Sequence, residues 1–203
     1  MTAANYVQMY PLMLNVTGLT IFVVGDDGAA ADRAAALIDH GGQHVLRFAG
    51  QFPTPADFAA HAPRLVFLTN TPTEARGEIH RLAKANGALV HVQDHIPLCD
   101  FHLPARLRRG RMLITVSTDG AVAGLSRLVR DYLANFVFGE EWSARVDELT
   151  IARQSWKASG LTMGTLFQAI TRHVAERGWL PCALNPPVTT NTESPIELFG
   201  RQR

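Results

Sequence analysis

Short apolar runs that alternate with helical patterns constrain most strongly what this chain can fold into. The first run, residues 19–24, is rich in β-branched side chains and ends at Gly25. Runs of this length and composition favour strands buried on both faces. Strand and helix alternating along a chain are typical of a parallel, doubly wound sheet. The further predicted strands are 44–48, 65–68 and 89–92, and the intervening helices are 27–38, 56–62 and 73–86.

The pattern changes after about residue 100. Residues 101–107 and 112–117 read as two strands joined by the turn Arg108-Arg109-Gly110-Arg111, which predicts an antiparallel hairpin. An apolar helical stripe follows, and helices are then expected over 140–157 and 162–177. The predicted fold class is therefore α/β, with a parallel sheet domain over 1–115, a dimerisation and helical domain over 116–182, and a disordered tail over 183–203. The stripe consists of Leu125, Leu128, Val129, Tyr132 and Leu133.

Composition excludes several classes of protein. The chain has 203 residues, of which 47% are hydrophobic and 18% charged, and its formal net charge of +1 provides no field for nucleic acid. No apolar run approaches the roughly 20 residues that span a bilayer, so no membrane role is expected. Residues 1–8 lack the pattern of a secretory leader, and Cys99 and Cys182 have no metal-binding spacing. We therefore expect a cytoplasmic protein with free thiols.

Ionisable residues gather just after the strand predicted at 89–92. Parallel sheets bind ligands beyond the carboxyl ends of their strands, and Asp94 lies at such an end. Asp94 is the candidate acid–base group, although an Asp shortly before Pro97 also suits a plain turn. His91 and His95 bracket Asp94, and these three residues are the candidate metal ligands; a hydrogen-bonded histidine pair is the alternative.

The loop after the first predicted strand suggests dinucleotide binding, in which glycines let the backbone approach a pyrophosphate. Its sequence is Gly25-Asp26-Asp27-Gly28-Ala29-Ala30, so Asp27 stands at the position of the second glycine of that pattern. A carboxylate there would repel a phosphate and would itself cap the helix. A capped helix without a nucleotide is thus the alternative. Arg47, at the end of the second strand, would favour a 2′-phosphate.

Three segments resemble a known family, the precorrin-2 dehydrogenase and sirohydrochlorin ferrochelatase domain of siroheme biosynthesis. The resemblance runs from about residue 10 to 133. Its opening matches Tyr10-Pro11-Leu12-Met13-Leu14 and Val23-Val24-Gly25; its centre matches His91-Val92-Gln93-Asp94 with Pro97-Leu98-Cys99-Asp100-Phe101; and its third segment matches Ser117-Thr118-Asp119-Gly120 with Leu125 and Arg127. The chain differs from the family at Asp26-Asp27, at His91 and at Val122-Ala123.

The resemblance implies a Rossmann-like fold and a homodimer. It also implies NAD-dependent oxidation of precorrin-2 to sirohydrochlorin, with iron (Fe2+) as the metal of an insertion step, and Asp94 acting in both reactions. The implied cofactor-binding residues are Gly25, Asp26, Asp27, Gly28, Ala29, Arg47 and Thr69. The implied substrate-binding residues are His91, Ser117, Thr118, Gly120 and Arg127. Arginines that could face the carboxylates of a tetrapyrrole are Arg106, Arg108, Arg109, Arg111, Arg127 and Arg130.

Three functions follow as alternatives. The first is a working dehydrogenase or chelatase, and the second is a divergent relative that binds a tetrapyrrole or nucleotide without turnover. The third is a dimeric scaffold without a small ligand. Asp26 and Asp27 predict weak dinucleotide affinity. Asp94, in contrast, is present at its place in the central segment, which favours acid–base chemistry on a tetrapyrrole or a metal. The apolar stripe supports a homodimer because one short helical region cannot cover it.

Overall fold

A computed structural model describes residues 9–180, and the tail predicted over 183–203 lies outside them. The chain forms two compact units. Among the described residues, the first contains 9–107 together with 115–133, and the second contains 108–114 together with 134–180. The units therefore interleave along the chain, because the segment between 107 and 115 belongs to the second one. A domain boundary at residue 115 stays a prediction.

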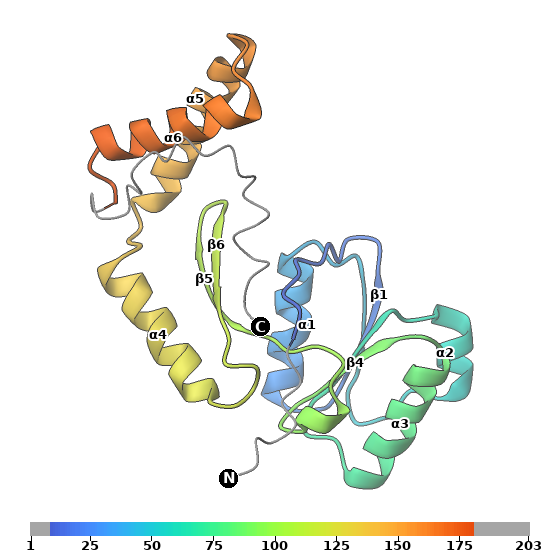
Figure 1. The fold of residues 1–203 in the computed structure, drawn as a ribbon. Helices are drawn as coiled ribbons and strands as arrows, with labels where there is room; N and C mark the ends of the chain where they lie inside the picture. The colour runs from blue at the N-terminus through green and yellow to red at the C-terminus, as the bar shows by residue number, and fades with distance from the viewer. Residues whose placement is uncertain (1–8, 181–203) are drawn as a thin grey trace, which may run out of the picture. The chain divides into compact units, whose positions relative to one another are not determined.

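The first unit contains the predicted parallel sheet (Figure 1). Its strands are β1 (Thr20–Val24), β2 (His44–Phe48), β3 (Leu65–Leu68) and β4 (Leu89–Val92), and their order is β2-β1-β3-β4. Every neighbouring pair is parallel, and Val24, Leu68 and Val92 lie side by side in register. The carboxyl ends of β1, β3 and β4 therefore meet at one edge. The predicted α/β fold class is confirmed.

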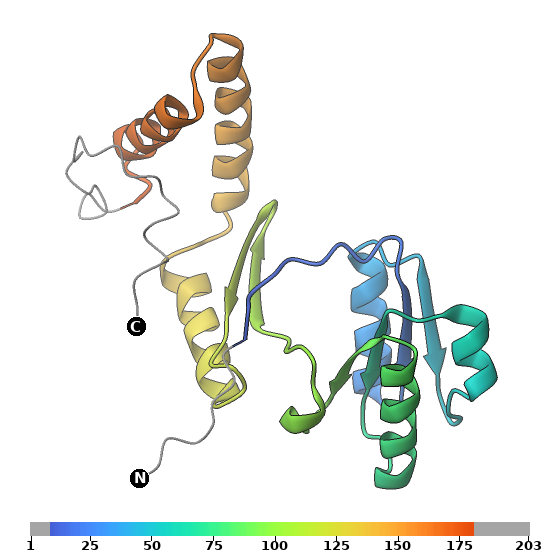
Figure 2. The same ribbon diagram turned by 45° about the vertical axis from the view of Figure 1, so that its right-hand side comes forward.

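Helices cover both faces of this sheet (Figure 2). They are α1 (Gly28–Asp39), α2 (Pro55–His61) and α3 (Thr73–Ala85). Alternate residues of β1 face opposite sides: Ile21 and Val23 join the core with Ala30 of α1, whereas Phe22 and Val24 join the core with Phe58 of α2 and Ile79 of α3. The four apolar residues of β1 from Ile21 to Val24 are fully buried. A strand apolar on both faces thus specifies the three-layer arrangement.

The helix starts follow from side-chain caps. Thr54 accepts a hydrogen bond from the Asp57 amide, and the Asp57 carboxylate accepts one from the Thr54 amide, so a reciprocal capping box begins α2. Asp27 is the N-cap of α1, which is why the helix begins at Gly28 and not at the predicted residue 27. Such caps satisfy amide groups that have no partner within the helix.

The predicted hairpin is present, but its register differs from the prediction. Its strands are β5 (Ala105–Arg109) and β6 (Met112–Val116), so residues 101–104 are not strand and only Gly110 and Arg111 form the turn. Gly110 has φ +54°, which suits glycine in a two-residue turn. Phe101 instead packs edge-on against Phe67, with ring centroids 5.4 Å apart. A short 3-10 helix, η1 (Ile96–Leu98), was not predicted.

The second unit is built on α5 (Trp142–Ala158) and α6 (Met163–Glu176), which pack against each other. His173 Nε2 lies 2.9 Å from Glu148 Oε1, joining the two helices. The preceding helix α4 (Ala123–Phe136) belongs to the first unit up to residue 133. The helices predicted over 140–157 and 162–177 are thus confirmed, with starts one or two residues later. Within residues 9–180, no helix has the length and apolar character that crossing a membrane would require.

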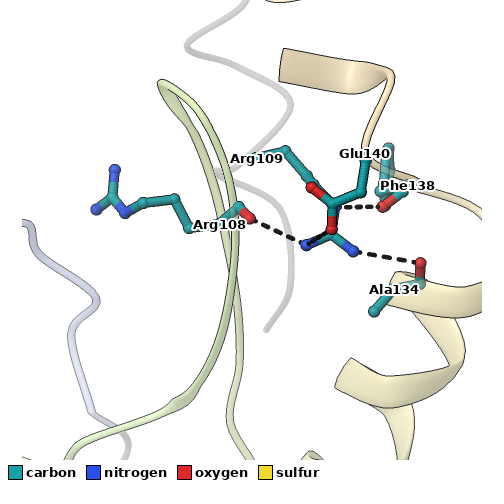
Figure 3. Close-up of polar contacts among 5 residues, drawn as sticks. All are labelled: Arg108, Arg109, Ala134, Phe138 and Glu140. Atoms are coloured by element: carbon teal, nitrogen blue, oxygen red, sulfur yellow. Dashed lines mark hydrogen bonds and ion pairs between the residues drawn. The ribbon is translucent and has the colours of Figure 1, made fainter.

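Arg109 of β5 forms contacts with the end of α4 and with the segment between α4 and α5 (Figure 3). Its Nε donates to the Phe138 carbonyl oxygen at 3.0 Å, and its Nη2 lies 3.5 Å from the Ala134 carbonyl oxygen. Its Nη1 also approaches Glu140 Oε1 at 3.2 Å. The Arg109 side chain is only 14% exposed. These contacts give Arg109 a structural role.

Candidate functional site

A cavity lies where the carboxyl ends of β1, β3 and β4 meet. Its volume is about 230 Å³, which suits one ring or side arm of a large ligand and not a whole macrocycle. This is the position at which open parallel sheets bind ligands. The structure therefore brings Asp94 and Asp27, predicted from separate segments, into one cavity. The lining residues are Asp27, Leu68, Asn70, Thr71, Arg76, Val92, Gln93, Asp94 and His95.

Asp94 follows β4 directly, in a turn, and its side chain is exposed. Its φ of +61° lies in the left-handed region, which a non-glycine residue adopts only when the surrounding structure requires it. Asn70, at the corresponding position after β3, has φ +41°. Both loops therefore turn sharply at the cavity. An exposed carboxylate on such a turn can exchange protons with a ligand at the mouth of the cavity.

His91 is held by contacts within the protein. Its Nδ1 lies 3.1 Å from the Phe101 carbonyl oxygen, and its ring packs between Phe67 and Phe101. Burial is the main cause that lowers the pKa of His91 below its usual value. His95 Nδ1 lies 3.3 Å from Arg76 Nη1. In the part of the chain that the structure describes, no three His, Cys, Asp or Glu side chains are grouped to hold a metal ion.

Cys99 is a packed thiol. Its Sγ donates to the Val92 carbonyl oxygen at 3.2 Å and accepts from the Val92 amide at 3.3 Å. Burial raises the pKa of the Cys99 thiol, which disfavours the nucleophilic thiolate. Cys99 is a free cysteine, as expected. Cys182 lies outside the described residues.

Gly25 and Thr69 are in close contact where β1 and β3 end. Gly25 has φ +146°, and a Cβ at this position would lie 2.7 Å from the Thr69 carbonyl oxygen, so only glycine fits. Thr69 is 4% exposed, and its hydroxyl is 3.2 Å from the Val24 carbonyl oxygen. The close packing of Gly25 against Thr69 therefore explains the glycine at the first position of the dinucleotide pattern.

Asp27 occupies the place that a pyrophosphate would take. Its Oδ1 accepts hydrogen bonds from the Ala30 amide at 2.9 Å and from the Thr69 hydroxyl at 3.1 Å. A dinucleotide would need the same helix terminus for its own phosphates. As the loop stands, its residues do not fit the pyrophosphate of NAD. Of the other predicted cofactor-binding residues, Asp26, Gly28, Ala29 and Arg47 are exposed at the ends of β1 and β2.

The segment 117–120 contacts the loop that follows Asp94. A Cβ on Gly120 would lie 3.0 Å from Ile96 Cδ1 and 3.2 Å from His102 Cε1, so the two segments touch. The Ser117 hydroxyl accepts from the Asp119 amide at 3.0 Å, and the Thr118 hydroxyl accepts from the Val122 amide at 3.0 Å. Both hydroxyls therefore organise the loop. Arg127, on α4, is exposed.

Asn70, Thr71 and Arg76 line the cavity but were not predicted. Asn70 and Thr71 follow the end of β3, so the rule that singled out Asp94 after β4 also applies to them. Arg76 lies in the first turns of α3, and only the packing of α3 beside the strand ends brings its side chain to the cavity.

Known proteins with similar sequences and a similar fold agree with a Rossmann-like domain. Residues 12–105 match the family described as putative NAD(P)-binding. Siroheme synthase of Nitrosococcus oceani is 28% identical over 147 residues, covering 64% of this chain and 31% of that protein. Siroheme synthase of Pseudoalteromonas atlantica is 30% identical over 158 residues, covering 71% of this chain and 33% of that protein. The chain thus spans about a third of the length of these relatives.

A solved structure, SirC, precorrin-2 dehydrogenase, shares the fold with a TM-score of 0.60 over 86% of this chain and 94% of that one, at 19% identity. The matched region and the sheet topology define a Rossmann-like domain of the NAD(P)-binding class. Within that class, the chain is similar to the N-terminal part of siroheme synthases, the family that its motifs resemble.

Proposed function

We propose that this protein acts on a tetrapyrrole in siroheme biosynthesis, oxidising precorrin-2 to sirohydrochlorin. The relatives and the fold support this reaction class. The observation that carries the proposal is the position of Asp94, at the mouth of the cavity where three parallel strands end. Asp94 is the residue that the family motif matches, and it is exposed to a ligand that approaches this edge.

Asp94 would serve as the proton acceptor. Oxidation of precorrin-2 removes hydrogen from the macrocycle, and one proton has to leave the ring. A carboxylate within hydrogen-bond reach of the reacting edge can take it, and such groups typically accelerate reactions about 10²- to 10⁴-fold. The family implies NAD(P) as the oxidant. Asp27 occupies the phosphate position, so the role proposed for Asp94 involves no contact with a bound dinucleotide.

Incubation of the purified protein with precorrin-2 and NAD(P) tests the proposal. Growth of the sirohydrochlorin absorption, dependent on both reactants, is the expected result. A perturbed tetrapyrrole spectrum without turnover would contradict dehydrogenase activity and support a binding protein. No spectral change at any protein concentration would contradict both functions.

The Asp27 contacts favour a second candidate, a tetrapyrrole-binding relative without dehydrogenase activity. In that case the Asp94 carboxylate would accept protons that pyrrole nitrogens lose when Fe2+, as a substrate, enters sirohydrochlorin. This reaction requires no dinucleotide. Fe2+ and sirohydrochlorin, incubated with the protein in the absence of NAD(P), would show metal insertion as a shift of the macrocycle absorption. An unchanged rate relative to a protein-free sample would contradict this candidate.

A homodimer is part of the proposal. The α4 stripe exposes apolar surface in the single chain, with Leu125 46% and Leu128 66% exposed. Soluble proteins usually cover contiguous apolar surface of this kind, and a second copy is the simplest cover. The cytoplasmic location expected from the sequence likewise stays a prediction.

A further inference from the structure

The residue after Asp94, His95, has hydrogen-bonding capacity that the protein leaves unused. Both residues line the cavity, and His95 is half-buried. The His95 ring contacts the protein through Nδ1, and no residue within 9–180 hydrogen-bonds its Nε2. Nε2 is therefore the ring nitrogen left for a ligand. Whether Nε2 carries hydrogen decides whether it donates to that ligand or accepts from it.

Two protein groups compete for His95 Nδ1. Arg76 Nη1 lies 3.3 Å from this atom, and the Gln93 carbonyl oxygen lies 3.2 Å from it. A guanidinium has donors only, so the Arg76 contact requires Nδ1 to accept. A carbonyl oxygen only accepts, so the Gln93 contact requires Nδ1 to carry hydrogen. A neutral imidazole satisfies one of the two, and the choice fixes which nitrogen is protonated.

The guanidinium of Arg76 is the stronger of the two competitors. A hydrogen bond from a charged donor is roughly twice as strong as one between neutral groups. A second contact, 3.1 Å from Arg76 Nη2 to Thr73 Oγ1, holds the guanidinium in place. Among the described residues, Arg76 has no carboxylate partner that would compete for it. The Gln93 contact is exposed, so water can replace it.

We propose that Arg76 is a positioning residue that keeps the hydrogen of neutral His95 on Nε2. This tautomer places a hydrogen-bond donor beside the Asp94 acceptor, in a cavity of about 230 Å³ that suits one ring of a macrocycle. A ligand that fits such a pair offers one N–H group and one unprotonated nitrogen. The tautomer does not depend on the function proposed above, whereas the identity of the ligand rests on it.

A metal-free tetrapyrrole carries both kinds of ring nitrogen. In a metallated tetrapyrrole all four nitrogens are bound to the metal, so neither contact can form. The pair of Asp94 and His95 therefore selects the metal-free macrocycle. Both reactions considered above start from such a macrocycle, because precorrin-2 oxidation and metal insertion each act on a ring system without a metal. The same selection favours release of a metallated product.

Nitrogen-15 NMR tests the tautomer without reference to function. Long-range proton–nitrogen correlation spectra at about pH 8, where a free imidazole is neutral, show which ring nitrogen carries hydrogen. The His95 signals are identified by their loss in His95→Gln. The wild type should show hydrogen on Nε2. Arg76→Met should gain the form with hydrogen on Nδ1 several-fold, because the Gln93 carbonyl oxygen is then the remaining partner.

Arg81→Met is the matched control, since Arg81 is exposed on α3 and does not line the cavity. Its His95 signals should match those of the wild type. Unchanged signals of the other histidines in Arg76→Met would show that this variant is folded. Hydrogen on Nδ1 in the wild type, or the same tautomer in wild type and Arg76→Met, would overturn the proposal.

Absorption titrations then test the ligand. The wild type should bind sirohydrochlorin more tightly than its square-planar nickel(II) complex. His95→Leu should reduce this preference about tenfold, as expected for one hydrogen bond. His95→Gln should keep most of it, because the longer side chain carries an amide donor near the place of Nε2. Equal wild-type affinity for the two ligands would refute the selection of the metal-free macrocycle. If the NMR result is as expected but neither ligand binds, the proposed function fails, whereas the positioning of His95 by Arg76 is upheld.

Discussion

The Asp27 carboxylate accepts a hydrogen bond from the Thr69 hydroxyl at 3.1 Å. This contact joins the loop after β1 to the end of β3, and the same oxygen atom caps α1 through the Ala30 amide. A residue at the position of a phosphate-contacting glycine has thus become part of the internal hydrogen bonding of the protein.

Asp27→Gly should tighten NAD binding. At roughly 4 Å, a carboxylate and a phosphate repel by about 1 to 4 kcal/mol, depending on the dielectric, and the substitution removes this term. Because glycine is itself a tolerated N-cap residue, loss of the Asp27 cap should cost only roughly a few tenths of a kcal/mol of stability. Calorimetric titration with NAD+ measures the affinity, and Asp27→Asn separates the charge from the space that the side chain fills. Asp26→Gly, at an exposed position, should add little. Low-micromolar NAD+ binding by the wild type would contradict this prediction.

Asp94→Asn should keep the fold and remove most of the turnover. The amide preserves the shape of the side chain but cannot accept the proton, so a loss of about 10²- to 10⁴-fold is expected. Asp94→Ala should lose a similar factor and also about 1 kcal/mol of stability, because alanine tolerates the left-handed φ of +61° less well. Turnover and thermal melting of the same samples measure both effects. Arg81→Gln, at an exposed position of α3 that does not line the cavity, is the control; normal turnover in Asp94→Asn would leave Asp94 a turn former only.

His91 should make the protein less stable in mild acid. Its pKa is lower in the folded protein than in the unfolded chain, so below about pH 6.5 the unfolded chain binds the extra proton. The contribution of His91 to stability is therefore present above that pH and is lost as the pH falls towards the folded pKa. His91→Phe, which keeps a ring between Phe67 and Phe101, should flatten this decline. Urea unfolding across this pH range measures it, and an unchanged pH slope in the variant would contradict the prediction.

Arg109→Met should destabilise the second unit. The variant keeps an apolar stem but leaves the Phe138 carbonyl oxygen without its donor, and loss of a hydrogen bond to a charged group costs about 1.5 to 3 kcal/mol. Arg108 is the matched control, since its guanidinium extends away from this contact on the neighbouring position (Figure 3). Denaturant unfolding should show a loss in Arg109→Met and nearly none in Arg108→Gln. Equal stability of the two variants would mean that the contact in Figure 3 is not stabilising.

Sedimentation at micromolar concentration should show a dimer. Leu128→Glu should shift it to the monomer, because a carboxylate would be buried in an interface formed by the α4 stripe. Ile151→Glu is the control, since Ile151 is also exposed, at 70%, but belongs to another helix, α5. A wild-type monomer, or dissociation by both variants alike, would be evidence against α4 as the interface.

Local patterns were sufficient for the sheet. The β-branched run of β1 and the helical periods around it predicted all four parallel strands, because burial on both faces imposes a composition that is visible in the sequence. The hairpin was placed less well. Phe101 looked like a strand residue, but its ring packs against Phe67 from a distant strand, and no local pattern carries that information.

The sequence by itself determined which strands and helices follow one another along the chain. It also determined that Asp94 lies at a strand end. Both depend on residues that are neighbours in the chain. Only the tertiary structure decided that Asp27 hydrogen-bonds Thr69 and that His102 lies against Gly120. These contacts join residues far apart in the sequence. They depend on how crossover helices pack and where side chains point, which periodicity leaves open.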